Sequence, residues 1–483
     1  MPQYDIEQQK FAMGFTAQLL VMSEIGDQGK LQDLATKRLQ ALLSHESIKE
    51  LIGEWEVVWG PVIYQHDSRI LDIPFTRSQG ADNCMYMVKC NNPDHSDQYV
   101  IAVAGTNLAF EESQFDTFVE AFSISKTRLW NQGQPWESPD DQTSEGKRIS
   151  LGISKGLNIL FNTQSNGKLL LEYLRELTSS NASLSITSSG HSLGCALSST
   201  LALSLSDQQA YWNPNGNANL SVFSFGGFTT GNEEWANYYN EQLGGKTKFL
   251  WNELDIAHYW FQSDLLKKLP TLYSPYIEPN PLIYGVNYIY QKMRNDIDYQ
   301  QICQDQKSFC VGYNPDAIEV IKSDIYPWFF PPLHISITSW LFQHLEYDAP
   351  PQELSNKVAE IVDPLIEACK GEIQSDTRKH GNFWENILNK LRRILGFYQK
   401  TTKTEVKLYI EKITAELLKY KSDLGRAEQL LGESLVGDNI KSLILYYAQW
   451  LYQHMYNYQK HMGVDGFFEI FVKDIKEKIV IRK

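Results

Sequence analysis

One stretch of the chain combines a strand pattern, a glycine-flanked serine and a helix pattern: Leu184-Ser185-Ile186-Thr187-Ser188-Ser189-Gly190-His191-Ser192-Leu193-Gly194-Cys195-Ala196-Leu197-Ser198. A serine at the tip of so tight a turn has a strained backbone, so the residues two before and two after it must lack bulky side chains. Gly190 and Gly194 meet that requirement. The following helix directs its N-terminal dipole and free amides at the serine, which favours an oxyanion there. The stretch predicts a nucleophile elbow with Ser192 at its tip; the alternative is a β-α turn with an incidental serine.

Strand-type and helix-type segments alternate on both sides of this elbow. The predicted strands are residues 55–64, 83–89, 98–104, 184–190, 220–227 and 247–252, and the predicted helices between them are 149–161 and 169–177. The first two strands after residue 80 have only a polar turn between them and predict a hairpin. Strands separated by helices predict an α/β sheet that is at least partly parallel. Catalytic groups of such sheets gather at the carboxyl ends of the strands.

Candidate partners of the serine follow two of these strands or come later in the chain. Thr106 follows a strand that ends in a glycine, where a backbone amide and a hydroxyl can face a neighbouring site; an ordinary Gly-Thr turn is the alternative. Asp255 lies just past the strand at 247–252, with Glu253 as its local competitor and a helix N-cap as its other common role. His334 and His344 come after it, in the order serine, acid, histidine. By order alone, either histidine could be the base.

Composition narrows the class of protein. The chain has 483 residues, 42% of them hydrophobic, and a net charge of -14, which argues against a nucleic-acid binder. The N-terminus lacks a basic segment followed by an uninterrupted apolar one, so we expect a cytoplasmic protein or one exported without a classical signal peptide. No stretch approaches the roughly 18 uncharged apolar residues that span a bilayer. Six cysteines are too few and too scattered for a disulfide scaffold.

The pattern predicts three regions. Residues 1–54 read as a helical N-terminal cover, 55–349 as the α/β domain with an insertion at about 257–330, and 350–483 as an all-helical C-terminal region. Within the last region, residues 383–397 form a basic amphipathic helix. Such a helix can lie on a membrane or bind a partner, although a bundle helix with its polar face in water is the more common role.

The motifs together resemble those of the class 3 lipases, a family with the α/β-hydrolase fold that includes fungal triacylglycerol lipases. Gly190-His191-Ser192-Leu193-Gly194 matches the family's nucleophile motif at all five positions. Ala104-Gly105-Thr106 is similar to its oxyanion strand, with alanine in place of the usual arginine, and Asn252-Glu253-Leu254-Asp255-Ile256 is similar to the stretch that carries its acid. His344-Leu345-Glu346-Tyr347 resembles the pattern around the family's base, which leaves His334 as the alternative base. The resemblance covers about residues 50–350.

The resemblance implies a serine esterase that acts on lipids. Ser192 is then the nucleophile, His344 the base and Asp255 the residue that orients it, with the amides of Thr106 and Leu193 as the oxyanion hole. No metal or organic cofactor is needed. The implied substrate is a triacylglycerol or a phospholipid, and residues 108–122 are the implied lid, which could contact a membrane. The alternatives are a feruloyl-type esterase or acyltransferase with the same triad, and a toxin-like protein that binds a membrane or a partner.

Overall fold

The computed structural model describes most of the chain in two compact units. The described residues are 2–66 except 23, 80–107, 123–278 except 181 and 182, 294, 296–317, 442 and 445–480. The first unit consists of Met1–Leu269, Tyr290–Tyr313 and Trp450–Lys483, and the second of Pro270–Ile289 and Asn314–Gln449. The elbow and Asp255 both belong to the first unit.

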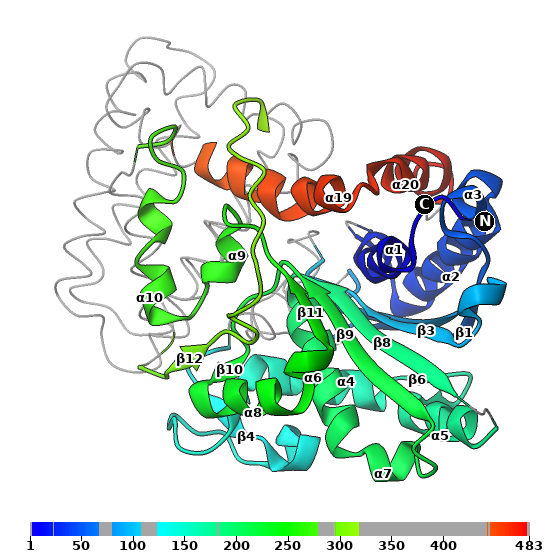
Figure 1. Cartoon of the computed structure of the whole chain (residues 1–483), viewed down its shortest axis with the longest axis horizontal. Helices are drawn as coiled ribbons and strands as arrows, with labels where there is room; N and C mark the ends of the chain where they lie inside the picture. Colours follow the sequence, from blue (N-terminus) through cyan, green and yellow to red (C-terminus); the bar gives the residue numbers. More distant parts are fainter. Residues whose placement is uncertain are drawn as a thin grey trace, which may run out of the picture. The chain divides into compact units, whose positions relative to one another are not determined.

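A six-stranded sheet lies at the centre of the first unit (Figure 1). Its strands, in spatial order, are β1 (Trp55–Tyr64), β2 (Asn83–Cys90), β3 (Gln98–Val103), β8 (Leu184–His191), β9 (Ala218–Phe225) and β11 (Thr247–Leu250). β1, β2 and β3 pair antiparallel, and β2 and β3 form the predicted hairpin. The strands from β3 to β11 run parallel. The predicted mostly parallel α/β sheet is confirmed.

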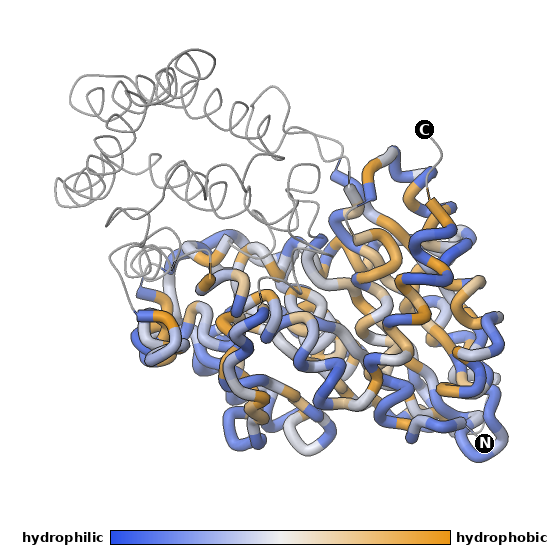
Figure 2. The backbone as a smooth tube through the Cα atoms, turned by 90° about the horizontal axis from the view of Figure 1, so that it is seen from above, coloured by the Kyte–Doolittle hydropathy of each residue, from blue (hydrophilic) through white to orange (hydrophobic). Residues whose placement is uncertain are grey.

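Helices cover both faces of this sheet. Figure 1 shows α1 (Ile6–Leu19) and α2 (Gln28–Ser44) on one side, and α4 (Leu151–Asn162), α5 (Leu170–Ser180), α6 (Leu193–Asp207) and α8 (Glu233–Leu243) on the other. Strands covered on both faces need apolar or small residues at nearly every position, and β8 is buried along almost its whole length. In Figure 2 the hydrophobic stretches run along the packed helices and strands, whereas hydrophilic stretches follow the outer loops.

The predicted N-terminal helices are present, and the first of them packs directly on the elbow strand. α1 begins with a capping box between Asp5 and Gln8, and α3 (Glu46–Ile52) follows α2. α1 lies against β3 and β8. Its Gly14 permits the close approach, because a Cβ atom at this position would lie 2.1 Å from the hydroxyl oxygen of Ser189. The first of the predicted N-terminal helices is therefore buried against the sheet.

The end of the chain also packs with the sheet. After a helix over 445–451, the segment continues through a wider, π-type turn at Tyr452–Tyr456 into α19 (Asn457–Met462) and α20 (Asp465–Ile470). The buried guanidinium of Arg38 in α2 donates to the carbonyl oxygens of Lys476 and Ile479, which ties this end to the N-terminal helices.

This packing differs from the predicted organisation. The prediction grouped all of 350–483 into one helical region, yet Trp450–Lys483 belongs to the unit that contains the sheet. The boundary at 349 and 350, the lid at 108–122 and the helix at 383–397 lie outside the described residues and stay predictions. The described part of the insertion at 257–330 contains two four-residue helices, α9 (Ile256–Tyr259) and α10 (Ser263–Leu266).

Two negative findings apply to the described part of the chain. No helix there is long and apolar enough to cross a membrane. All five cysteines there are free thiols.

Candidate active site

The predicted strand, sharp turn and helix are present around Ser192. The serine separates β8 from α6 and has φ 59° and ψ -124°, a left-handed conformation that side chains disfavour. The flanking glycines are required by space, because a Cβ at Gly190 would lie 2.3 Å from the carbonyl oxygen of Gly194. A Cβ at Gly194 would lie 2.3 Å from the carbonyl oxygen of Val103. The turn is a strained elbow that only glycine neighbours allow, and it leaves Ser192 7% exposed.

The oxyanion candidates lie beside this elbow. β3 runs parallel to β8 with Val103 opposite Gly190, so the segment that follows β3 leaves the sheet at the same end as Ser192. Among the described residues, the backbone amides of Thr106 and Leu193 donate no hydrogen bond. Leu193 is also the first residue of α6, where the helix dipole and free amides attract negative charge. Both amides are available to an oxyanion.

Asp255 is fully buried and its carboxylate is saturated with donors. It follows β11, the last parallel strand of the sheet. One oxygen, Oδ1, accepts from the backbone amide of Ala257 at 3.0 Å and from the indole of Trp450 at 3.2 Å. The other, Oδ2, accepts from His454 Nδ1 and from the hydroxyl of Tyr458, both at 2.8 Å. Glu253, its competitor in the sequence, is exposed and accepts a hydrogen bond from Ser308 instead.

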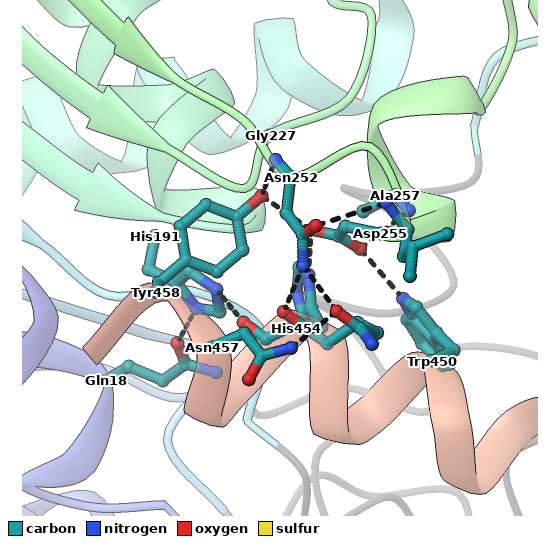
Figure 3. A network of polar contacts seen from close by, with 12 residues as sticks. Gln18, His191, Gly227, Asn252, Asp255, Ala257, Trp450, His454, Asn457 and Tyr458 are labelled. Atoms are coloured by element: carbon teal, nitrogen blue, oxygen red, sulfur yellow. Dashed lines mark hydrogen bonds and ion pairs between the residues drawn. The ribbon is translucent and has the colours of Figure 1, made fainter. Parts of the chain in front are cut away.

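The histidine on Asp255 is His454. Its side chain is 5% exposed, and its ring packs against the ring of His191, the residue before Ser192, with 4.4 Å between the ring centroids (Figure 3). Because a carboxylate only accepts, Nδ1 of His454 donates to Asp255, which in the neutral ring leaves the lone pair on Nε2. Within the described part of the chain, nothing hydrogen-bonds this Nε2. His454 therefore has the tautomer that a general base needs.

Three side chains from one helix face bind the same carboxylate. Trp450, His454 and Tyr458 are spaced four residues apart, which places them on one face of the helix. Burial, and then the negative charge of Asp255, raise the pKa of Tyr458 well above its ordinary value, so its hydroxyl stays a donor. The backbone amide of Asn252, after β11, donates to that hydroxyl at 3.1 Å. Hydrogen bonds from Asn252 and to Asp255, both after β11, thus hold the C-terminal helix against the carboxylate.

Sequence reasoning missed these three residues. It placed them only within the all-helical C-terminal region at 350–483. The available signal was the four-residue spacing of an indole, an imidazole and a phenol, each a hydrogen-bond donor. The predicted bases His344 and His334 lie outside the described residues, so their role stays a prediction. Within the described ranges, no three histidine, cysteine, aspartate or glutamate side chains gather closely enough to hold a metal ion.

The fold, with its elbow at the end of a parallel strand, defines an α/β-hydrolase. The family model described as "Lipase (class 3)" matches residues 116–271. Among solved structures, the chain is similar to M37 lipase, with 26% identity and a TM-score of 0.54 over 68% of this chain and 92% of that chain. No curated protein sequence matches. The match over residues 116–271 and the similarity to M37 lipase support a class 3 lipase domain in this chain and, with its α/β-hydrolase fold and elbow, a carboxylic ester hydrolase.

Two fungal enzymes align over shorter parts of the chain. Lipase II from Rhizopus niveus has 14% identity and a TM-score of 0.32 over 49% of this chain and 74% of its own. Lip2 lipase from Yarrowia lipolytica has 16% identity and a TM-score of 0.32 over 53% of this chain and 75% of its own. The family resemblance stated from the motifs is confirmed by the family match and the M37 lipase structure.

Proposed function

We propose that this protein hydrolyses carboxylic esters of lipids through an acyl-enzyme on Ser192, with His454 as the base and Asp255 as the residue that orients it. The observation that carries the proposal is the 2.8 Å contact between Asp255 Oδ2 and His454 Nδ1, next to the strained elbow. An acid, an imidazole in the right tautomer and a serine at the end of a parallel strand are the parts of a serine hydrolase.

The reaction has two halves. Ser192 Oγ attacks the ester carbonyl carbon while its proton moves to His454 Nε2, and the carbonyl oxygen becomes an oxyanion. The amides of Thr106 and Leu193 donate to that oxyanion, and each such donor contributes on the order of 3 kcal/mol to the transition state. His454 returns the proton to the leaving alcohol. Water then attacks the acyl-serine by the same route and releases the fatty acid.

The choice of His454 departs from the family motif, which pointed to His344. His454 has the contact that the base requires, because its Nδ1 donates to a carboxylate that three other groups hold in place. It also lies in a π-type turn, an irregularity that often marks functional sites. We therefore assign the base to His454.

The proposed substrate class is an acyl ester of a lipid, with triacylglycerol and phospholipid as the two candidates. Support comes from the class 3 lipase family and from the similarity to M37 lipase. The proposed lid at 108–122 includes apolar residues suited to an acyl chain: Leu108, Phe110, Phe115, Phe118 and Phe122. A feruloyl-type esterase or acyltransferase with the same triad is separated from this proposal by its preference among acyl groups.

The test compares the full-length protein with Ser192→Ala on p-nitrophenyl esters from butyrate to palmitate. We expect turnover in the wild type alone, together with covalent labelling by a fluorophosphonate that the variant loses. Lipid profiling of the products from triolein and phosphatidylcholine vesicles then identifies the substrate class. Equal hydrolysis by wild type and variant would refute the proposal.

A further inference from the structure

A polar side chain of the N-terminal helix is buried beside the site. Gln18 lies in the last turn of α1 and is 3% exposed. A buried amide destabilises the fold unless its donor and acceptor are both bonded. The class 3 resemblance begins only at about residue 50, so it assigns Gln18 no role.

Both ends of the Gln18 amide bind residues of the proposed site or next to it, and Figure 3 shows the end that faces His191. Its Nε2 donates to the backbone carbonyl of Thr106 at 3.1 Å. Its Oε1 lies 2.7 Å from Nδ1 of His191. The other ring nitrogen of His191, Nε2, lies 2.8 Å from the backbone carbonyl oxygen of His454. One buried chain of polar contacts thus joins the oxyanion segment, the elbow and the turn that carries the base.

We propose that Gln18 is a positioning residue for ester hydrolysis, which holds Thr106 in register with the elbow through its amide. This inference rests on the proposed function. The carbonyl that Gln18 binds and the amide that would bind the oxyanion belong to the same residue, Thr106. Fixing the carbonyl therefore limits the rotation of Thr106 and keeps its amide directed at the oxyanion.

The glycine before Thr106 shows how closely this segment is packed. A Cβ at Gly105 would lie 2.5 Å from the backbone oxygen of His191 and 2.8 Å from Oε1 of Gln18. The elbow and the Gln18 amide are therefore the nearest neighbours of the oxyanion segment at Gly105.

The protonation state of His191 determines which hydrogen bond it can make with Gln18. Burial, and then the charge of His454, lower the pKa of His191 well below its ordinary value, so its ring is neutral. A neutral imidazole has one N–H for two acceptors, Gln18 Oε1 and the carbonyl of His454. The Oε1 atom of Gln18 therefore competes with the carbonyl oxygen of His454 for the single N–H of His191. A neutral His191 also leaves His454 free to take the positive charge that forms in the reaction.

The chain offers a matched control on the same helix. Gln9 is 1% exposed, donates to the carbonyl of Tyr4 at 2.8 Å and accepts from the indole of Trp55 at 3.1 Å. It is a buried glutamine with both amide ends bonded, but none of its partners belongs to the proposed site. Gln9→Met and Gln18→Met therefore remove comparable structural contacts.

The experiment measures kcat and KM of the full chain on p-nitrophenyl butyrate, at a temperature where wild type and both variants are folded by circular dichroism. We expect Gln18→Met to lower kcat by about 10- to 100-fold with KM nearly unchanged, as a misplaced donor does. Gln9→Met should keep the wild-type kcat while losing thermal stability. Reaction of Ser192 with a fluorophosphonate should slow in Gln18→Met alone.

Equal kcat in the two methionine variants overturns the inference. A higher KM with an unchanged kcat in Gln18→Met also overturns it. If Gln18→Met does not fold, Gln18→Glu replaces it; this isosteric variant keeps the acceptor for His191 but places an acceptor against the carbonyl of Thr106. The same fall in kcat is expected, and a wild-type kcat overturns the inference. Wild-type protein without esterase activity would instead refute the proposed function, so the two failures are distinguishable.

Discussion

Asp255→Asn tests the site because the four donors around the carboxylate dictate how the new amide must lie. Ala257 and Trp450 donate through N–H groups that cannot accept, so the amide oxygen must face them. The amide NH2 then faces His454 and Tyr458, where the carboxylate had accepted two hydrogen bonds. The Tyr458 hydroxyl can turn to accept, and His454 can accept only by moving its proton from Nδ1 to Nε2. The variant should fold with the wrong tautomer of the base.

The expected loss is about 10⁴-fold in kcat, which corresponds to about 5 kcal/mol of transition-state stabilisation. The assays are kcat on p-nitrophenyl butyrate and ¹⁵N NMR of the histidine tautomer. Asp207→Asn is the matched control, because Asp207 also accepts from an indole, Trp130 at 2.7 Å, and a phenol, Tyr238 at 2.6 Å. A loss below about tenfold, or a retained Nδ1–H tautomer of His454 in the variant, would refute the reasoning.

Three further predictions address the base, the pH dependence of stability and the packing of α1. His454→Ala should lower kcat at least about a thousandfold while His344→Ala leaves most of it; the opposite result in the ester assay restores the motif-based assignment. Burial lowers the pKa of His258 to about 4, so the folded state resists a proton that the unfolded chain binds below about 6.5. About 3 kcal/mol of stability should be lost as pH falls from 6.5 to 4, and His258→Phe, compared by urea unfolding, should remove this part of the pH dependence. Gly14→Ala should destabilise by about 1 to 3 kcal/mol because its Cβ meets β8, whereas Gly29→Ala, with no contact nearer than 3.4 Å, should not; equal unfolding midpoints would contradict this packing.

The part of the candidate site that lies on one continuous segment was predictable from the sequence. Residues 184–207 form the strand, elbow and helix that the sequence indicated, because a serine at φ 59° needs glycines on both sides. Asp255 was placed after a strand and is buried there, whereas Glu253 is exposed. The sheet, its hairpin and the N-terminal helices were also predictable. Their signals are the periodic spacing of apolar residues and the turn residues, which act over a few positions of the chain.

The base and its supports were not predictable in this way. His454 lies 199 residues from Asp255 in the chain, and Gln18 lies 173 residues from His191. A local motif pointed to His344, and the pattern of α1 indicated only a cover. Helical spacing places Trp450, His454 and Tyr458 on one face of a helix. The local sequence does not indicate which buried group that face contacts.

The division between the two kinds of result has a physical cause. The sequence alone determined the elbow with Ser192 at its tip and the parallel sheet, because steric limits at glycines and the periods of helix and strand operate between near neighbours. Only the tertiary structure decided that a C-terminal helix supplies the imidazole on Asp255 and that α1 supplies the amide on His191. Loop closure depends weakly on loop length, so distance along the chain carries almost no information about which distant groups meet. Packing of complementary donors and acceptors makes that choice.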